Sequence, residues 1–116
     1  MGLTYLEGEI KGPKGRRHLR FLVDSGASYS LLPERAWKAI GLRPKRTMKF
    51  SLADGTTIER GVTECLISLH EGEAHSPVIL GTAGDEALLG AVTLEVLGLV
   101  LNPFNRTLQP MRAMLA

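Results

Sequence analysis

The stretch RFLVDSGASYSLLP, residues 20–33, places one carboxylate, Asp24, directly after the apolar run 21–23. A carboxylate buried at the end of a core strand costs free energy unless it is paired, hydrogen-bonded or protonated. Gly26 lets the backbone come close, so that an amide can point at the carboxylate, and the Ser25 hydroxyl can brace the turn. Asp-Ser-Gly also fits a plain Asx-type turn with no role in chemistry. The surrounding sequence has to decide between these interpretations.

The elements expected to position Asp24 are mostly short strands. Strands at 3–10 and 18–24 predict a hairpin around the turn 11–15, followed by a brief strand at 30–32. Proline at position 33 and glycine at position 41 bound a predicted helix at 34–40. The remaining expected elements are a hairpin of strands 47–52 and 57–62 around an Asp-Gly turn, a hairpin of strands 63–70 and 75–80, a strand at 86–89, a helical segment at 91–97, and strands at 99–101 and 107–109.

Composition favours one globular domain spanning residues 1–116. Of the 116 residues, 44% are hydrophobic and 22% charged, as in soluble folded proteins. The formal net charge of +2 is too small to indicate a nucleic-acid partner by itself. No stretch approaches the roughly 18 consecutive apolar residues of a membrane helix, and the N-terminal stretch lacks the apolar region of a secretory signal. We therefore expect a cytoplasmic protein without nucleic-acid or membrane partners.

Three motifs together resemble the retropepsin-like aspartic proteases, and the cellular and bacterial members more than the viral ones. The first is apolar-apolar-Asp-Ser-Gly-Ala, which ends at Ala27 and is followed by Ser28 and a Leu-Leu-Pro sequence. The second is the Ala-Asp-Gly turn at 53–55, about thirty residues later. The third is Ala-Leu-Leu-Gly at 87–90, followed by the predicted short helix. Their order and spacing fit the family across residues 18–109.

The resemblance implies an all-β, closed barrel-like acid-protease fold with one or two short helices. Members hydrolyse peptide bonds with two carboxylates that share a proton and hold a water between them, and the resemblance implies no metal or cofactor. Of the three aspartates, Asp24, Asp54 and Asp85, only Asp24 stands in the Asp-Ser-Gly motif. The expected active form is therefore a two-fold homodimer that pairs Asp24 with its mate and cleaves a peptide or protein substrate.

Site residues follow from the resemblance by position. Asp24, Ser25 and Gly26 are the expected catalytic residues, Ser25 standing where the family has a threonine that braces the dimer. Residues 50–62 would form a flap that closes over the peptide and excludes water. The expected substrate-binding residues are Ala27, Ser28, Ala53, Asp54, Gly55, Thr56, Leu88 and Leu89. Ser28 and Ala91 replace an Asp and an Arg that pair in many viral enzymes, so both partners of that ion pair are missing together.

Other chemistry-bearing groups have simpler interpretations. The single cysteine, Cys65, excludes an intrachain disulfide and a cysteine-based zinc site, and we expect it to be a small buried hydrophobe. The stretch 70–75, HEGEAH, has the wrong spacing and a glycine for a helical zinc motif, so we expect a solvated turn and no metal. The basic stretch 11–20 lacks interleaved aromatic residues and is expected to be a solvated loop.

Two function classes remain open from the sequence. The first is a homodimeric aspartic endopeptidase. The alternative is a catalytically weak or inactive retropepsin-like dimer that acts as a peptide-binding or assembly module. The intact Asp24-Ser25-Gly26 sequence favours the enzyme, because a scaffold needs no acid pair, although fold-level analogy does not establish function.

Overall fold

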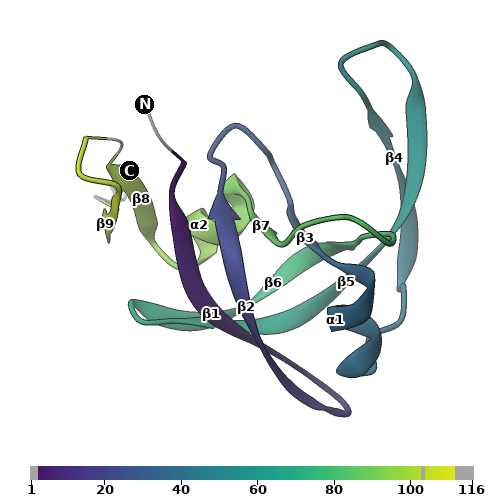
Figure 1. Ribbon diagram of the computed structural model, residues 1–116, viewed down its shortest axis with the longest axis horizontal. Coiled ribbons are helices and arrows are strands. Elements are labelled where there is room, and N and C mark those ends of the chain that lie inside the picture. Colours follow the sequence, from purple (N-terminus) through teal and green to yellow (C-terminus); the bar gives the residue numbers. More distant parts are fainter. Residues whose placement is uncertain (1–2, 103, 112–116) are drawn as a thin grey trace, which may run out of the picture.

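The structure, a computed structural model, describes residues 3–102 and 104–111. This part of the chain forms strands and two short helices in the order shown in Figure 1. They are β1 (Tyr5–Gly12), β2 (Gly15–Val23), β3 (Ser30–Leu32), α1 (Glu34–Ala39), β4 (Arg46–Ser51), β5 (Thr57–Leu69), β6 (Gly72–Leu80), β7 (Leu88–Leu89), α2 (Ala91–Val96), β8 (Leu99–Asn102) and β9 (Thr107–Pro110).

The main sheet closes on itself. Its strands run in the order β1-β2-β7-β3-β6-β5-β4, and β1 also pairs with β5. The pairing of Gly8 with Leu69 and of Lys11 with Leu66 joins the two sides of the ring, and β4 lies outside it on the edge of β5. This confirms the predicted all-β, closed barrel with two short helices. Closure pairs β1 with β5, so that within the ring each strand has two neighbours, and β4 alone is left as an edge strand of this sheet.

Alternating side chains from opposite walls fill the barrel. In β2, Phe21 and Val23 are buried while their neighbours are more exposed, as the two-residue period of a strand requires. Ile10, Ile67 and Leu89 have no exposed surface. Ala36 of helix α1 and Ile40, the residue that caps its C-terminal end, extend this core. The Trp37 indole donates a hydrogen bond to the Gly81 carbonyl at 2.9 Å. The catalytic candidates therefore rest on a packed scaffold.

Strand β5 corrects the prediction of two separate strands at 57–62 and 63–70. It is continuous over 13 residues, because Val62 pairs with Arg46 of β4 on one side and with Ile79 of β6 on the other. The sequence has no turn at the predicted boundary, because residues 62 and 63 are Val and Thr, which are both typical of strands. The two predicted hairpins thus share one strand, which carries the β4–β5 hairpin well beyond the barrel in Figure 1.

Several element ends also differ from expectation. The first hairpin stays paired up to Gly12 and Gly15, so its turn is two residues long rather than the predicted 11–15; Gly15 permits this with φ +136°. The strand predicted at 86–89 is only Leu88–Leu89, because only these two residues pair with Leu22 and Val23 of β2. Strands β8 and β9 form a separate antiparallel pair, and the turn predicted between them includes residue 103, which lies outside the described residues. No helix in the described ranges is long and apolar enough to cross a membrane.

Candidate active site

Asp24 directly follows β2, where the strand meets β7. Val23 pairs with Leu89, and the Asp24 amide donates to the Leu89 carbonyl at 3.0 Å. The Asp24 carboxylate oxygen Oδ1 accepts a hydrogen bond from the Gly26 amide at 2.9 Å, and the Ala27 amide donates to the Asp24 carbonyl at 3.1 Å. The predicted tight turn is therefore formed, and its geometry points one carboxylate oxygen at a backbone donor.

The carboxylate of Asp24 is not buried in the protomer, in contrast to the opening expectation of a charge in a core. Asp24, Ser25, Gly26 and Ser28 are exposed, and Ala27 is half-buried. The reason is that Val23 is the last buried residue of β2, and the chain then turns away beyond the end of the barrel (Figure 1). The cost of an isolated buried charge is therefore absent in a single chain, and solvent can reach this group.

Helix α2 holds the Asp24 loop, which we define as residues 24–29. The first amides of the helix, those of Ala91 and Val92, donate to the carbonyls of Ala27 and Ser28 at 2.7 and 2.9 Å. These amides have no partner inside a helix, and α2 has no side-chain cap. A Cβ atom at Gly90 would lie 2.6 Å from the Tyr29 carbonyl carbon and oxygen, so the close approach requires glycine there.

A buried chain of three hydroxyl groups lies behind the loop, and the sequence interpretation did not single it out. The Ser30 hydroxyl accepts from the Gly90 amide at 3.0 Å and lies 2.5 Å from the Thr93 hydroxyl, which lies 2.7 Å from that of Ser76. All three side chains are at most 1% exposed. The sequence signal was weak: Thr93 stands inside the apolar stretch 91–94, but Ser30 and Ser76 have polar residues nearby in the chain, so only the rule that buried polar groups need partners could have suggested the chain.

The β4–β5 hairpin presents the second set of predicted residues at its tip. Ala53, Asp54, Gly55 and Thr56 are all exposed. The Asp54 carboxylate accepts from the Thr56 hydroxyl at 2.6 Å and from the Thr56 amide at 3.0 Å. The hydroxyl first, and then the amide, lower the pKa of Asp54 below its ordinary value. Asp54 therefore has a local structural task, which is to close the turn in which Gly55 adopts φ +87°.

Leu88 and Leu89 lie between the two strands that flank the Asp24 loop, because β7 is inserted between β2 and β3. Leu89 is fully buried in the core, whereas Leu88 is half-buried. The two residues thus lie in the strand that separates β2 from β3, and their role in substrate binding stays a prediction. Only Leu88 retains surface that another molecule could contact.

A cavity of about 240 Å³ opens beside Ser25. Its wall comes from α2, β8 and the residue after β9, and includes Ala91, Leu94, Leu99, Val100, Leu101 and Met111. Val100 is 47% exposed and Met111 37% exposed. Exposed apolar side chains grouped around one opening are typical of surfaces that a partner covers. This places an apolar surface next to the Asp-Ser-Gly turn.

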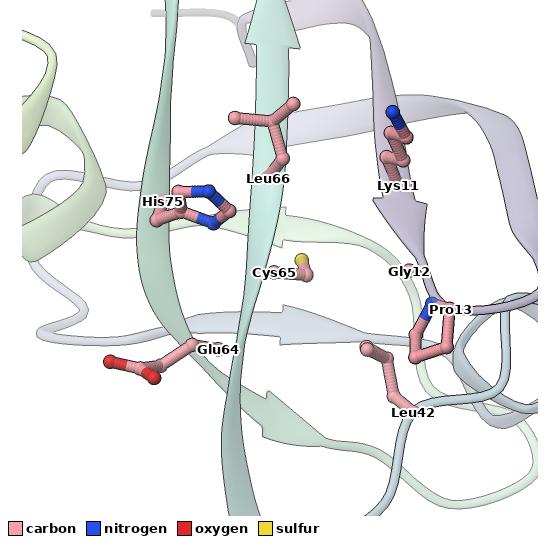
Figure 2. A pocket seen from close by; sticks show the side chains of 8 residues that line it. All are labelled: Lys11, Gly12, Pro13, Leu42, Glu64, Cys65, Leu66 and His75. Carbon is pink, nitrogen blue, oxygen red and sulfur yellow. The ribbon is translucent and has the colours of Figure 1, made fainter.

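A larger cavity, of about 360 Å³, lies away from the predicted site residues and contains none of them. Figure 2 shows it between the end of β1 and strands β5 and β6, with Cys65 near its centre and His75 and Lys11 on opposite sides. Burial raises the pKa of the Cys65 thiol to about 12, so this thiol is not an activated nucleophile. The cavity therefore does not offer a rival catalytic centre built on cysteine.

The predicted solvated turn in the HEGEAH stretch joins β5 and β6, where His70 and Glu71 are exposed. Glu73 accepts a hydrogen bond from the Ser68 hydroxyl at 2.8 Å. Within the part of the chain that the structure describes, no three His, Cys, Asp or Glu side chains gather as a metal site would need.

Comparison with known families agrees with this geometry. A family model described as gag-polyprotein putative aspartyl protease matches residues 7–96. The chain belongs to this family. The matched range contains the Asp24 loop, the whole β4–β5 hairpin, β7 and α2. The match to the aspartyl protease family therefore covers every element that carries the predicted site. No curated protein matches the chain as a relative.

Proposed function

We propose that this chain is an aspartic endopeptidase whose active site forms between two copies of the chain. The observation that carries the proposal is the state of Asp24: its carboxylate is exposed beyond the end of the barrel and oriented by the Gly26 amide at 2.9 Å. A general base must be both accessible to substrate and held in direction. Membership of the aspartyl protease family supports the reaction type.

The other two aspartates have tasks in turns of their own. Asp54 accepts two hydrogen bonds from Thr56 at the tip of the β4–β5 hairpin. Asp85 accepts from the amide and the hydroxyl of Thr82 at 2.7 and 3.2 Å. A second catalytic carboxylate therefore has to come from a second chain, and two-fold symmetry supplies the same Asp24.

In this dimer the two Asp24 carboxylates share one proton, because two adjacent negative charges repel each other. The ionised Asp24 takes a proton from a water molecule, which attacks the peptide carbonyl carbon, and the protonated mate donates its proton to the carbonyl oxygen, giving a tetrahedral diol. The diol then collapses: the C–N bond breaks, the amide nitrogen leaves as an amine with the proton that the first Asp24 removed from water, and the mate takes a proton back from one hydroxyl as the carboxylic acid forms. Ser25 braces the two loops against each other across the axis. Ala27 and Ser28 border the bound peptide backbone, and Leu88 borders its side chains.

The flap of this proposal is the β4–β5 hairpin, with Ala53, Asp54, Gly55 and Thr56 at its tip. Closing it over a peptide removes water from the carboxylate pair and fixes the scissile bond. The tip is exposed along its whole length in the unliganded protomer, as a lid that closes on a ligand requires.

Cleavage of a peptide library between about pH 4 and 7 tests the proposal directly. We expect cleavage that a pepstatin-type inhibitor blocks and that declines as the shared proton is lost at higher pH. Asp24→Asn should abolish cleavage and leave the protomer folded, since an amide can still accept the bond from Gly26. Asp85→Asn is the matched control, because it makes the same chemical change at a turn that the proposal leaves out of the chemistry.

Cleavage by the Asp24→Asn protein would contradict the assignment of the carboxylate pair. Activity that rises steadily into the alkaline range would indicate another nucleophile. Inhibitor or peptide binding without cleavage, by a dimeric wild-type protein, would contradict the enzyme and select the peptide-binding or assembly module instead.

A further inference from the structure

One aromatic contact joins the Asp24 loop to the β4–β5 hairpin. The rings of Tyr29 and Phe50 lie edge to face, with centroids 6.2 Å apart and an interplanar angle of 82°. Both side chains are half-buried. Such pairs stabilise beyond the burial of their area, and their T-shaped geometry constrains orientation as well as distance.

The Tyr29 end of this contact is anchored. The backbone on its N-terminal side is held by the hydrogen bond from the Val92 amide to the Ser28 carbonyl at 2.9 Å. On its C-terminal side the Ser30 hydroxyl accepts from the Gly90 amide, and Gly90 itself packs directly against the Tyr29 carbonyl. The ring of Tyr29 therefore projects from a fixed base that also orients Asp24.

The Phe50 end belongs to a segment with little packing of its own. Phe50 pairs with Ile58, and only one further pair, Ser51 with Thr57, separates it from the tip. Residues 51–57 are all exposed. The tip beyond Phe50 therefore has no buried side chain that fixes its position or orientation relative to the barrel. Elements with few buried contacts open readily unless something at their base restrains them.

We propose that Tyr29 and Phe50 are positioning residues that set the resting position of the flap relative to Asp24. The pair transmits the fixed geometry of the Asp24 loop to Phe50, the half-buried residue of β4 nearest the tip. This inference rests on the proposed function, because it treats the hairpin as the flap of a protease. It adds a specific contact of this chain that restrains the flap before any peptide binds.

Amide hydrogen exchange in the unliganded protein tests the restraint without any need for catalysis. The reporters are the amides of Leu52 and Gly55, which close the tip by donating to the carbonyls of Thr56 and Leu52 at 2.8 and 3.0 Å. Phe50→Leu and Tyr29→Leu should each speed exchange there about two- to tenfold, the range that the loss of an aromatic pair implies. The Val78 amide in the core should not change.

Control variants separate this role from a general structural one. Met48→Leu changes an apolar side chain two residues away on the same face of β4 and should leave the tip amides as in the wild type. Tyr29→Phe keeps the ring and should do the same. The Phe50→Leu, Tyr29→Leu double variant should exchange no faster than either single variant, because both remove one contact. Unchanged exchange in the single variants, or additive effects in the double, would overturn the inference.

Peptide cleavage supplies the second readout. Phe50→Leu should raise KM about two- to tenfold and change kcat less, because a less ordered flap loses more conformational entropy when it closes on substrate. The two proposals fail separately. If the wild-type protein cleaves nothing but the leucine variants still exchange faster at the tip amides, the protease is contradicted and the positioning pair is not. If the wild-type protein is active but the variants exchange at the wild-type rate, the positioning pair is contradicted and the protease is not.

Discussion

A carboxylate keeps a fixed direction only if its oxygens accept hydrogen bonds from fixed donors. For Asp24 this donor is the amide of Gly26, two residues later. This part of the site was predictable from sequence, since the Asp-Ser-Gly turn is formed by neighbouring residues. Its exposure was not predictable, because it depends on where β2 leaves the barrel. Tyr29 and Phe50 were not predictable either, since the contact joins residues 21 positions apart across two elements.

Cys65 gives a prediction at the same scale. It is 3% exposed, and burial raises the pKa of its thiol from 9.0 to about 12. The folded thiol should therefore resist alkylation by iodoacetamide near neutral pH and react once denaturant exposes it, as mass spectrometry would show. Because the folded pKa lies above the unfolded value, the stability contributed by the neutral thiol is complete below about pH 9 and is lost as the pH rises toward 12.

Rapid alkylation of the native protein would contradict this assignment and would make the cavity in Figure 2 a reactive site. Cys65→Ala is the control, because it removes the target and should abolish the mass shift in denaturant.

At the scale of elements, the short helix α2 and the Asp24 loop depend on each other. The loop carbonyls satisfy the first helical amides, and the Ser30–Thr93–Ser76 hydroxyl chain ties β3, α2 and β6 together in the core. The positions of most hairpins were predictable because Gly, Pro and Asp-Gly turns are local signals. The continuity of β5 and the brevity of β7 were not, because both depend on pairing with strands distant in sequence.

Thr93→Val tests the hydroxyl chain. The substitution keeps the shape of the side chain but leaves the buried hydroxyls of Ser30 and Ser76 without their shared partner. We expect a loss of about 1–3 kcal/mol in the free energy of unfolding, measured by urea denaturation. Thr63→Val is the matched control, because Thr63 is also buried, at 5% exposure, but lies outside this hydroxyl chain. Equal losses in the two variants would contradict a special role for the chain.

At the scale of the whole molecule, one barrel presents one Asp-Ser-Gly turn next to an exposed apolar surface. The cavity beside Ser25, with Val100 and Met111 at 47% and 37% exposure, lies where a second copy would have to approach. The sheet closes through β1 and β5 within one chain. In the proposed dimer, assembly is therefore a step separate from closure of the barrel, and catalysis should depend on it.

Mixing experiments test this dependence more sharply than a measured molecular mass. An Asp24→Asn subunit should still assemble with the wild type, but the mixed dimer has only one ionisable carboxylate at its centre. After equilibration with an equal amount of the variant, random pairing leaves about half of the original activity, and a threefold excess leaves about a quarter. Asp85→Asn subunits, which retain Asp24, should add activity instead. Activity that stays constant as Asp24→Asn protein is added would show that each chain carries a complete site, and would refute the shared carboxylate pair.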